Sequence, residues 1–296
     1  MTSIDAATDA ASRTGRSERS DRSQRSERER IDWGAVRAIM RRDLTAVGRS
    51  KAVVLPMLLV PLLLLVLLPM SVAIAARGAT WDVSQFLTMV PGRLAAPVNR
   101  VPENERLIIL VLGYLVAPLF LIVPLMVSAV LAGDAFAGEK ERKTLETVLH
   151  LPVRDTDLYI GKLLVGFVPS VAVSWIGFVL FCIVSNTAAW PIMHRVFLPT
   201  QLWALMILWI APATAALGLG IMVRVSVRVN NTQEAQQLGG AVVLPLVILA
   251  VGQTTALMLA GLWPTFLAGA ALWVIAIWLN VRGERSFTRD AMAARL

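Results

Sequence analysis

The side chains best suited to catalysis or metal binding are few in this chain and widely spaced. Its 296 residues include two histidines, His150 and His194, and one cysteine, Cys182. No His-Glu-x-x-His, Gly-x-Ser-x-Gly or Cys-x-x-Cys pattern occurs. The phosphate-binding pattern Gly-x-x-x-x-Gly-Lys-Ser/Thr is absent as well. We therefore predict that the chain is not an enzyme, holds no metal or cofactor, and does not bind nucleotide phosphates itself.

A charged segment interrupts the apolar sequence at residues 138–152, which read Gly-Glu-Lys-Glu-Arg-Lys-Thr-Leu-Glu-Thr-Val-Leu-His-Leu-Pro. Opposite charges four residues apart favour a short helix here, and the proline ends it. Leu145 and Leu149 belong to an apolar stripe on that helix, and Asp155 and Thr156 offer caps for the next one. A solvated connector is the alternative. Because a connector has no need of an apolar stripe, we predict a docking site for a soluble partner.

Together with the Asp-Leu-Tyr-Ile-Gly-Lys that follows, this segment resembles the signature loop of type-2 ABC exporter permeases. That loop typically reads Glu-Lys-Glu-Arg-Gly-Thr-Leu-Glu-x-Leu-Leu-x-x-Pro-Val and then Gly-Lys, and Lys143 stands here where glycine is common. The resemblance covers residues 31–283. The basic helix before the first apolar stretch resembles the family's interfacial elbow, and residues 231–236 resemble its second cytoplasmic loop. The layout is most similar to sodium- or drug-efflux-like permeases.

The resemblance implies the permease subunit of an ATP-driven exporter. Two permease chains, identical or merely similar, would form the path, and separate ATPase subunits would bind below them. The coupling residues that it implies are Glu139, Lys140, Glu141, Arg142, Thr144, Leu145, Glu146, Leu149 and Pro152, with Gln233, Glu234 and Gln236 in the second cytoplasmic loop. The alternatives are an intramembrane enzyme, which would need paired catalytic groups at membrane depth, and an assembly protein without transport activity.

The elements that position this loop are predicted to be membrane helices. Hydrophobic residues make up 56% of the chain and charged residues 16%, against about a quarter charged in soluble domains. The uncharged stretches predict an all-α integral membrane fold with six spans, at residues 53–76, 107–133, 163–184, 202–223, 239–259 and 262–281. Only a short turn separates the last two spans, so a single re-entrant hairpin is the alternative there.

Two different segments precede the first span. Residues 1–30 are rich in serine and arginine, cannot bury a core, and are predicted to be disordered. Residues 31–51 predict an amphipathic helix on the membrane surface, because charges such as Asp43 exclude a spanning role. Its apolar face is predicted to hold Trp33, Val36, Met40, Leu44 and Val47. The alternative is a soluble helix packed on a partner.

The basic residues predict the orientation of the chain. Of the 28 lysines and arginines, 23 lie on the side of the two termini and of loops 133–162 and 224–238, and 5 lie on the other side. This bias places both termini, including the tail 284–296, in the cytoplasm, with the spans in the cell membrane. Because the basic residues flank apolar runs, we expect contacts with anionic lipids and not with nucleic acid.

The predicted spans contain no Asp, Glu, Lys, Arg or His, whereas ion-coupled carriers usually need an ionisable group at that depth. The candidates for lining a translocation path are hydroxyl residues: Ser128, Ser170, Ser174 and Thr214. Hydrogen bonding between helices is the alternative role for them. An interior that has hydroxyl groups but no charged side chains would suit an amphipathic cargo.

Overall fold

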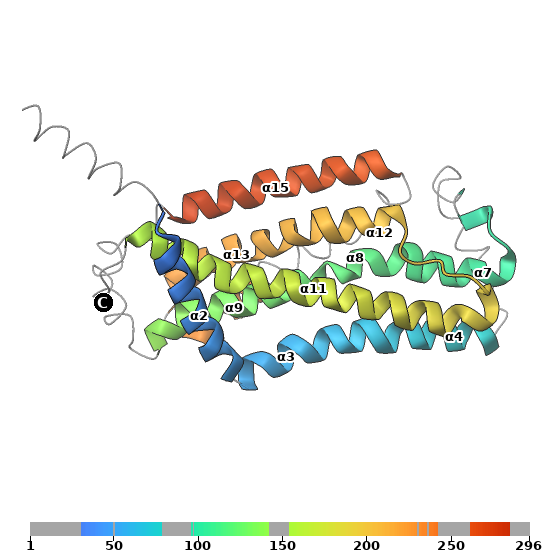
Figure 1. Ribbon diagram of the computed structural model, residues 1–296, viewed down its shortest axis with the longest axis horizontal. Coiled ribbons are helices and arrows are strands. Elements are labelled where there is room, and N and C mark those ends of the chain that lie inside the picture. Colours follow the sequence, from blue (N-terminus) through green and yellow to red (C-terminus); the bar gives the residue numbers. More distant parts are fainter. Residues whose placement is uncertain are drawn as a thin grey trace, which may run out of the picture.

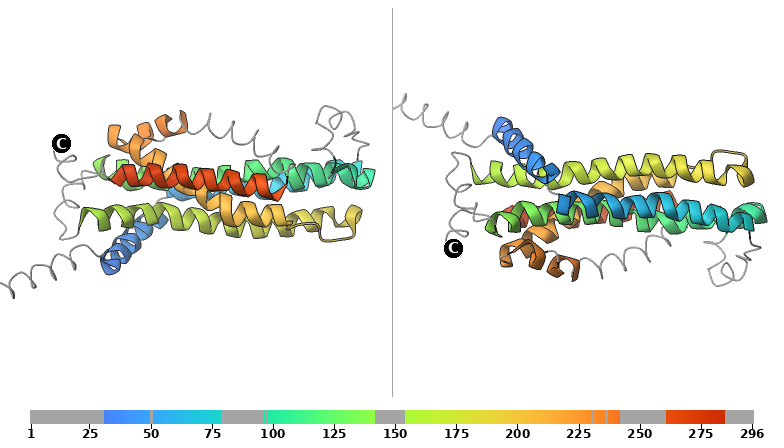
Figure 2. Two further views of the ribbon diagram at one scale, coloured as in Figure 1. Left: turned by 90° about the horizontal axis from the view of Figure 1, so that it is seen from above. Right: turned by 90° about the horizontal axis from the view of Figure 1, so that it is seen from below.

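The computed structural model describes residues 31–49, 51–78, 96, 98–141, 154–229, 231–235, 237–241 and 261–284. The described part is helical and contains no strand. Its long helices lie along a common axis and form an elongated bundle (Figures 1 and 2). Helix α2, Trp33–Arg49, departs from that axis and crosses one end of the bundle obliquely. We refer to this end as the α2 end.

The other helices are α3 (Lys51–Leu62), η1 (Leu63–Leu67), α4 (Leu68–Gly78), α7 (Glu103–Ile108), η2 (Ile109–Leu115), α8 (Val116–Phe120), α9 (Ile122–Glu141), α11 (Asp155–Met193), α12 (Gln201–Leu205), η3 (Met206–Ile210), α13 (Ala211–Arg228) and α15 (Leu262–Glu284). The C-terminal ends of α9, α13 and α15 lie at the α2 end, as does the N-terminal end of α11 (Figure 1). The segments flanking both predicted cytoplasmic loops therefore meet at one end of the bundle.

Within the described residues, four helical stretches are long and apolar enough to cross a membrane: Glu103–Gly138, Asp155–Met193, Gln201–Ser226 and Leu262–Gly283. These stretches contain the predicted second, third, fourth and sixth spans and extend beyond them. The first predicted span falls in the continuous helical stretch of α3, η1 and α4, which includes the shorter apolar helix Leu63–Arg77. The predicted fifth span lies outside the described residues beyond residue 241. The fold is that of an all-α membrane protein.

Helix α11 extends well beyond the span predicted for it. Its 39 residues measure about 58 Å at 1.5 Å per residue, against about 30 Å for the apolar thickness of a bilayer. The prediction that Asp155 or Thr156 caps this helix is wrong, because the helix is preceded by Arg154, whose side chain makes no cap hydrogen bond. Asp155 and Asp157 lie in the first turn instead, where negative charge is favourable to the helix dipole.

Three of the long helices contain a π-helical segment, and each segment closely precedes a proline. Pro69, Pro118 and Pro212 follow η1, η2 and η3 within three residues. A proline has no N–H to donate, and its ring clashes with the carbonyl of the residue four positions earlier. In each case that earlier residue lies inside the π-helical segment. The wider turn thus accommodates the proline without ending the helix.

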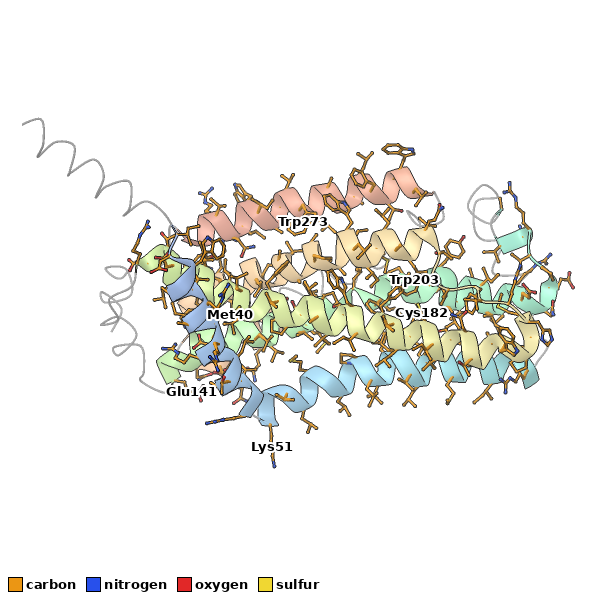
Figure 3. The ribbon with its side chains drawn as sticks, in the orientation of Figure 1. Met40, Lys51, Glu141, Cys182, Trp203 and Trp273 are labelled. Atoms are coloured by element: carbon orange, nitrogen blue, oxygen red, sulfur yellow. The ribbon has the colours of Figure 1, made fainter. Side chains whose placement is uncertain are left out.

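The largest apolar cluster surrounds Trp203 (Figure 3), which is fully buried. Its ring stacks on Phe178 at 5.4 Å between centroids and meets the edge of Phe120 at 5.7 Å. The indole N–H donates to the Gly113 carbonyl at 3.1 Å, which satisfies its polar atom. This side chain therefore joins η2, α8, α11 and α12 into one packed unit.

Candidate coupling site at the α2 end

Helix α2 begins at a capped terminus and packs through one face. The Asp32 carboxylate accepts hydrogen bonds from the N–H groups of Gly34 at 2.8 Å and Ala35 at 3.2 Å, which is N-cap geometry. The side chains that this helix buries are Val36, Ile39 and Val47. Trp33 was predicted to lie on the same face but is 61% exposed. Ile39 takes its place, so the buried face is rotated relative to the predicted one.

The start of α2 is fixed to the first turns of α11. The backbone N–H of Asp32 donates to the Asp157 carboxylate at 3.2 Å. Asp157 is only 1% exposed although it lies in the first turn of its helix. Ile39 packs in the same apolar cluster as Leu158 and Tyr159 of α11. Apolar and polar contacts thus hold α2 across the beginning of α11.

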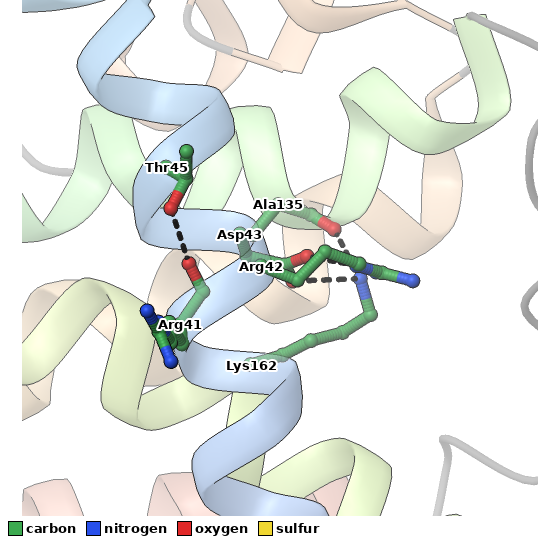
Figure 4. Close-up of polar contacts among 6 residues, drawn as sticks. All are labelled: Arg41, Arg42, Asp43, Thr45, Ala135 and Lys162. Atoms are coloured by element: carbon green, nitrogen blue, oxygen red, sulfur yellow. Dashed lines mark hydrogen bonds and ion pairs between the residues drawn. The ribbon is translucent and has the colours of Figure 1, made fainter.

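Lys162 lies at the centre of this junction and is completely buried. Its Nζ atom donates a hydrogen bond to the Ala135 carbonyl of α9 at 2.7 Å (Figure 4). The same Nζ atom lies 4.0 Å from Oδ2 of Asp43 on α2 and 5.5 Å from the centroid of the Phe136 ring. One ammonium group on α11 therefore contacts both α9 and α2.

Burying a charge of this kind is unfavourable by several kcal/mol unless its partners are well placed. Here a carbonyl, a carboxylate and the face of an aromatic ring surround the Lys162 ammonium. The other carboxylate oxygen of Asp43 binds Arg42 at 2.7 Å, so that Asp43 is shared between two cations (Figure 4). Each of these contacts depends on the relative positions of α2, α9 and α11.

A second contact at this end joins the two predicted cytoplasmic loops. The Glu141 carboxylate, at the C-terminal end of α9, accepts a hydrogen bond from the N–H of Thr232 at 2.9 Å. The Asn231 side chain accepts from the N–H of Glu234 at 2.7 Å and so caps a short helical turn. Glu141 is the last residue of α9 and lies at the α2 end of the bundle (Figure 3). The segment after α13 is therefore attached to the end of α9.

The structure describes only some of the predicted coupling residues. Glu139, Lys140 and Glu141 are the last residues of α9, so they continue the second membrane helix. In the second loop, Gln233 and Glu234 are exposed. The predicted residues outside the described part of the chain are Arg142, Thr144, Leu145, Glu146, Leu149, Pro152 and Gln236.

The four predicted path residues are packed inside the bundle. The hydroxyls of Ser128, Ser170, Ser174 and Thr214 donate to the carbonyls of Leu125, Phe167, Ser170 and Ala211, three or four residues earlier on the same helices. Ser128 also lies where helices approach closely, since a Cβ atom added at Gly218 would come within 2.5 Å of its Oγ. In this conformation their hydroxyls are engaged with backbone, and a path lined by them would require the helices to separate.

Asp43, Asp157 and Lys162 are not among the functional residues predicted from the sequence. The charge of Asp43 only argues against a spanning helix, and Lys162 is part of the sequence pattern only as the end of the Gly-Lys pair. The position of Lys162 in the sequence could have indicated its role, because this residue directly precedes the uncharged stretch of the predicted third span. A charge at such a boundary needs a partner when it faces the bundle.

Comparison with known families gives one match that covers most of the chain. The family model described as ABC-2 family transporter protein matches residues 37–267. The matched range contains most of α2, the Lys162 junction and the contact between Glu141 and Thr232. A comparison with curated proteins finds no match.

Proposed function

The chain belongs to the ABC-2 family of transporter proteins, and we propose that it is the permease subunit of an ATP-driven exporter that couples to a separate ATPase subunit through residues 138–162. As a member of this family it is a multi-pass membrane protein and the transmembrane component of an ABC transporter. That component is not itself catalytic. ATP is hydrolysed by the partner subunit, and the energy reaches this chain as a movement of the coupling loop.

The main support for the proposal is the hydrogen bond from the Lys162 Nζ atom to the Ala135 carbonyl. Ala135 precedes the coupling loop on α9, and Lys162 follows it on α11. The two helices that lead into and out of the loop are therefore fastened to each other near its base. A force applied to the loop moves both helices together instead of bending one of them.

Two further contacts at the α2 end connect this movement to other helices of the bundle. Asp43 connects α2 to the Lys162 ammonium, and Glu141 connects α9 to the segment that follows α13. Helices are stiff along their axes, so a displacement at the α2 end is felt along each of them. Together these contacts provide a mechanical connection between the coupling loop and four helices of the bundle.

In this proposal the α2 end faces the cytoplasm and the bundle lies in the cell membrane. The distribution of 23 against 5 basic residues supports this orientation, with both termini in the cytoplasm. Helix α2 then lies at the inner surface of the membrane, which suits its position across the end of the bundle.

The complex that we propose contains a second permease chain, either identical or similar, and the ATPase subunits. Within one chain the candidate path hydroxyls are buried against neighbouring helices. A path between two chains would not need a pore through this packed interior. Export of an amphipathic cargo past an interface of apolar helices is consistent with the absence of charged residues from the predicted spans.

Docking is tested with the double variant Leu145→Ala/Leu149→Ala. Each leucine contributes about 1.5–3 kcal/mol when fully buried, so losing half of that from each weakens ATPase binding about tenfold or more. The measurement is co-purification of the ATPase with the chain from membranes. The matched control is Leu55→Ala/Leu59→Ala, because these leucines of α3 are also four residues apart and are 66% and 48% exposed. Full retention of the ATPase by the loop variant would contradict the proposal.

Transmission is tested separately with Lys162→Met. Since the Lys162 side chain is completely buried, it is not expected to contact the ATPase, and this variant should still retain it. ATP hydrolysis by the retained ATPase should no longer respond to transport substrate or to the membrane environment. A variant that binds the ATPase and transports at the wild-type rate would show that the Lys162 junction only supports the fold.

A further inference from the structure

Two prolines in the membrane helices leave a backbone carbonyl without its usual donor. In a π-helical segment each N–H donates to the carbonyl five residues earlier, and η2 and η3 keep this pattern up to the residue that follows each segment. Pro118 stands five residues after Gly113 of η2, and Pro212 stands five residues after Ile207 of η3. Because proline has no N–H, neither carbonyl receives the backbone hydrogen bond that would continue the pattern.

Tryptophan side chains supply the missing donors at both places. Nε1 of Trp203 donates to the Gly113 carbonyl at 3.1 Å, and Nε1 of Trp175 on α11 donates to the Ile207 carbonyl at 3.2 Å. The apolar core of a bilayer contains no water to satisfy a free carbonyl, so a donor from a neighbouring helix is needed. Each indole N–H thus takes the place of a proline N–H and connects a π-helical segment to another part of the bundle.

The two tryptophans differ in how firmly they are held. Trp203 is fully buried, and its ring packs against Phe120, Phe178 and Phe181. Trp175 is 45% exposed and lies at the surface of the bundle. Withdrawing Trp203 would open the largest apolar cluster, whereas Trp175 can leave η3 without disturbing that cluster.

Helix α15 holds η3 by more contacts than α11 does. Nε1 of Trp273 on α15 donates to the Trp209 carbonyl at 3.1 Å, and Nε1 of Trp209 donates to the Phe266 carbonyl of α15 at 3.3 Å. The rings of Trp209 and Phe266 also stack, with 5.3 Å between their centroids. Trp273 and Trp203 are labelled in Figure 3. If the bond from α11 is lost, η3 therefore stays with α15.

We infer that η3 is a hinge in the continuous helix of α12, η3 and α13, and that Trp175 controls this hinge through its hydrogen bond to the Ile207 carbonyl. While the bond is made, η3 is held against α11. When Trp175 leaves, the helix bends at the π-helical segment, because the proline there cannot complete the backbone hydrogen bonding. Segment η3 then moves together with α15 away from α11.

This movement concerns two of the candidate path hydroxyls. Ser174 directly precedes Trp175, and Thr214 lies two residues after Pro212. Both hydroxyls are engaged with backbone carbonyls of their own helices while the bundle is closed. Separation of η3 from α11 is a step by which such residues could reach a translocation path. That role rests on the proposed function, whereas the hinge itself does not.

The test is double electron–electron resonance on the full chain in lipid nanodiscs, in a Cys182→Ser background. Spin labels on Ile183→Cys in α11 and Leu267→Cys in α15, which are 57% and 63% exposed, report the separation of the two helices. Trp175→Phe keeps an aromatic ring but removes the donor. It should raise the population of a longer distance about fivefold, the effect of one net hydrogen bond. The control is Trp190→Phe, at a 51% exposed position of the same helix, which should leave the distances unchanged.

A proline substitution separates the hydrogen bond from packing of the ring. In Pro212→Ala the new backbone N–H donates along the helix and makes the indole donor unnecessary. The double variant Trp175→Phe/Pro212→Ala should therefore lose the longer distance that Trp175→Phe adds. A second label pair, Ile74→Cys with Ile183→Cys, spans α4 and α11 and should show no change in either variant.

Three results would overturn the inference: unchanged distances in Trp175→Phe, an equal change in Trp190→Phe, or a longer distance that persists in the double variant. If Trp175→Phe does not fold, Pro212→Ala alone decides the outcome. Its Trp175 indole N–H, no longer needed by the Ile207 carbonyl, should exchange with solvent deuterium faster than in the wild type, and an unchanged rate would contradict the hinge. None of these measurements involves the ATPase, so their failure is distinguishable from failure of the proposed function.

Discussion

Gly161 of α11 and Ile39 of α2 touch where the two helices cross. A Cβ atom added at Gly161 would lie 3.0 Å from Cγ2 of Ile39 and 3.5 Å from the backbone carbonyl of Val36. Both neighbours belong to α2, so the missing side chain determines how closely α2 approaches. Lys162 is the next residue, and its contact with Asp43 exists only at this separation. The two adjacent residues thus act together: Gly161 allows α2 to approach closely, and Lys162 contacts Asp43 on that helix.

We predict that Gly161→Leu separates α2 from α11 and destabilises the protein. Forcing a larger side chain into packed structure costs about 1–3 kcal/mol, which would appear as a lower unfolding temperature in detergent. Gly48→Leu is the control, because an added Cβ at Gly48 in α2 meets nothing within 4 Å. Equal effects of the two substitutions would mean that the crossing tolerates a side chain.

The second prediction concerns the Lys162 ammonium. Lys162→Met should destabilise the protein by about 1–3 kcal/mol, because it removes the buried hydrogen bond to the Ala135 carbonyl while Asp43 keeps its bond to Arg42. The double variant Asp43→Asn/Lys162→Met should be more stable than the sum of the single effects predicts, by about 0.5–3 kcal/mol. The measurement is a double-mutant cycle of thermal unfolding.

The control for this cycle is Lys51→Met, since Lys51 is exposed and points away from the bundle (Figure 3). A surface substitution of this kind should change stability by no more than about 0.5 kcal/mol. Strict additivity of the Asp43 and Lys162 substitutions would show that the two charges do not interact, despite the 4.0 Å between their nearest atoms.

A third prediction concerns the end of the bundle opposite α2. Asn186 donates from Nδ2 to the Leu198 carbonyl at 2.8 Å and accepts at Oδ1 from the N–H of Phe197 at 2.9 Å. Asn186→Asp removes the donor and sets a carboxylate against that carbonyl. Because an unsatisfied buried polar group costs about 1–3 kcal/mol, amide hydrogen exchange at Phe197 and Leu198 should become faster. Asn99→Asp, at an exposed position, should leave these rates unchanged.

The fourth prediction tests the orientation of the bundle. In a Cys182→Ser background the chain has no other thiol, so single cysteines report accessibility directly. A cysteine at Asn99 should react with an impermeant thiol reagent in intact cells. One at Glu234 should react only after the membrane is opened, although both positions are exposed in the structure. The reverse pattern would place the α2 end outside the cytoplasm.

The sequence predicted the positions of the four long apolar helices found in the described part of the chain, but not where these helices begin and end. Uncharged stretches long enough to cross a bilayer are a local property, and Leu262 begins both the predicted sixth span and helix α15. Helices continue past the apolar stretch wherever polar residues are also helical, which is why α9 reaches Glu141 and α11 begins at Asp155. Transfer free energy determines which residues are in the membrane, but backbone hydrogen bonding decides where each helix stops.

The sequence by itself determined the membrane fold, the bias of basic residues toward one side, and the position of the charged segment after the second span. Each of these depends on composition or short-range periodicity, which are visible in a linear chain. Only the tertiary structure decided that Lys162 meets Asp43, that Glu141 binds the backbone of Thr232, and that Trp175 donates to the Ile207 carbonyl. Such pairs depend on how helices far apart in sequence cross and rotate against one another, and this is decided by packing over the whole bundle.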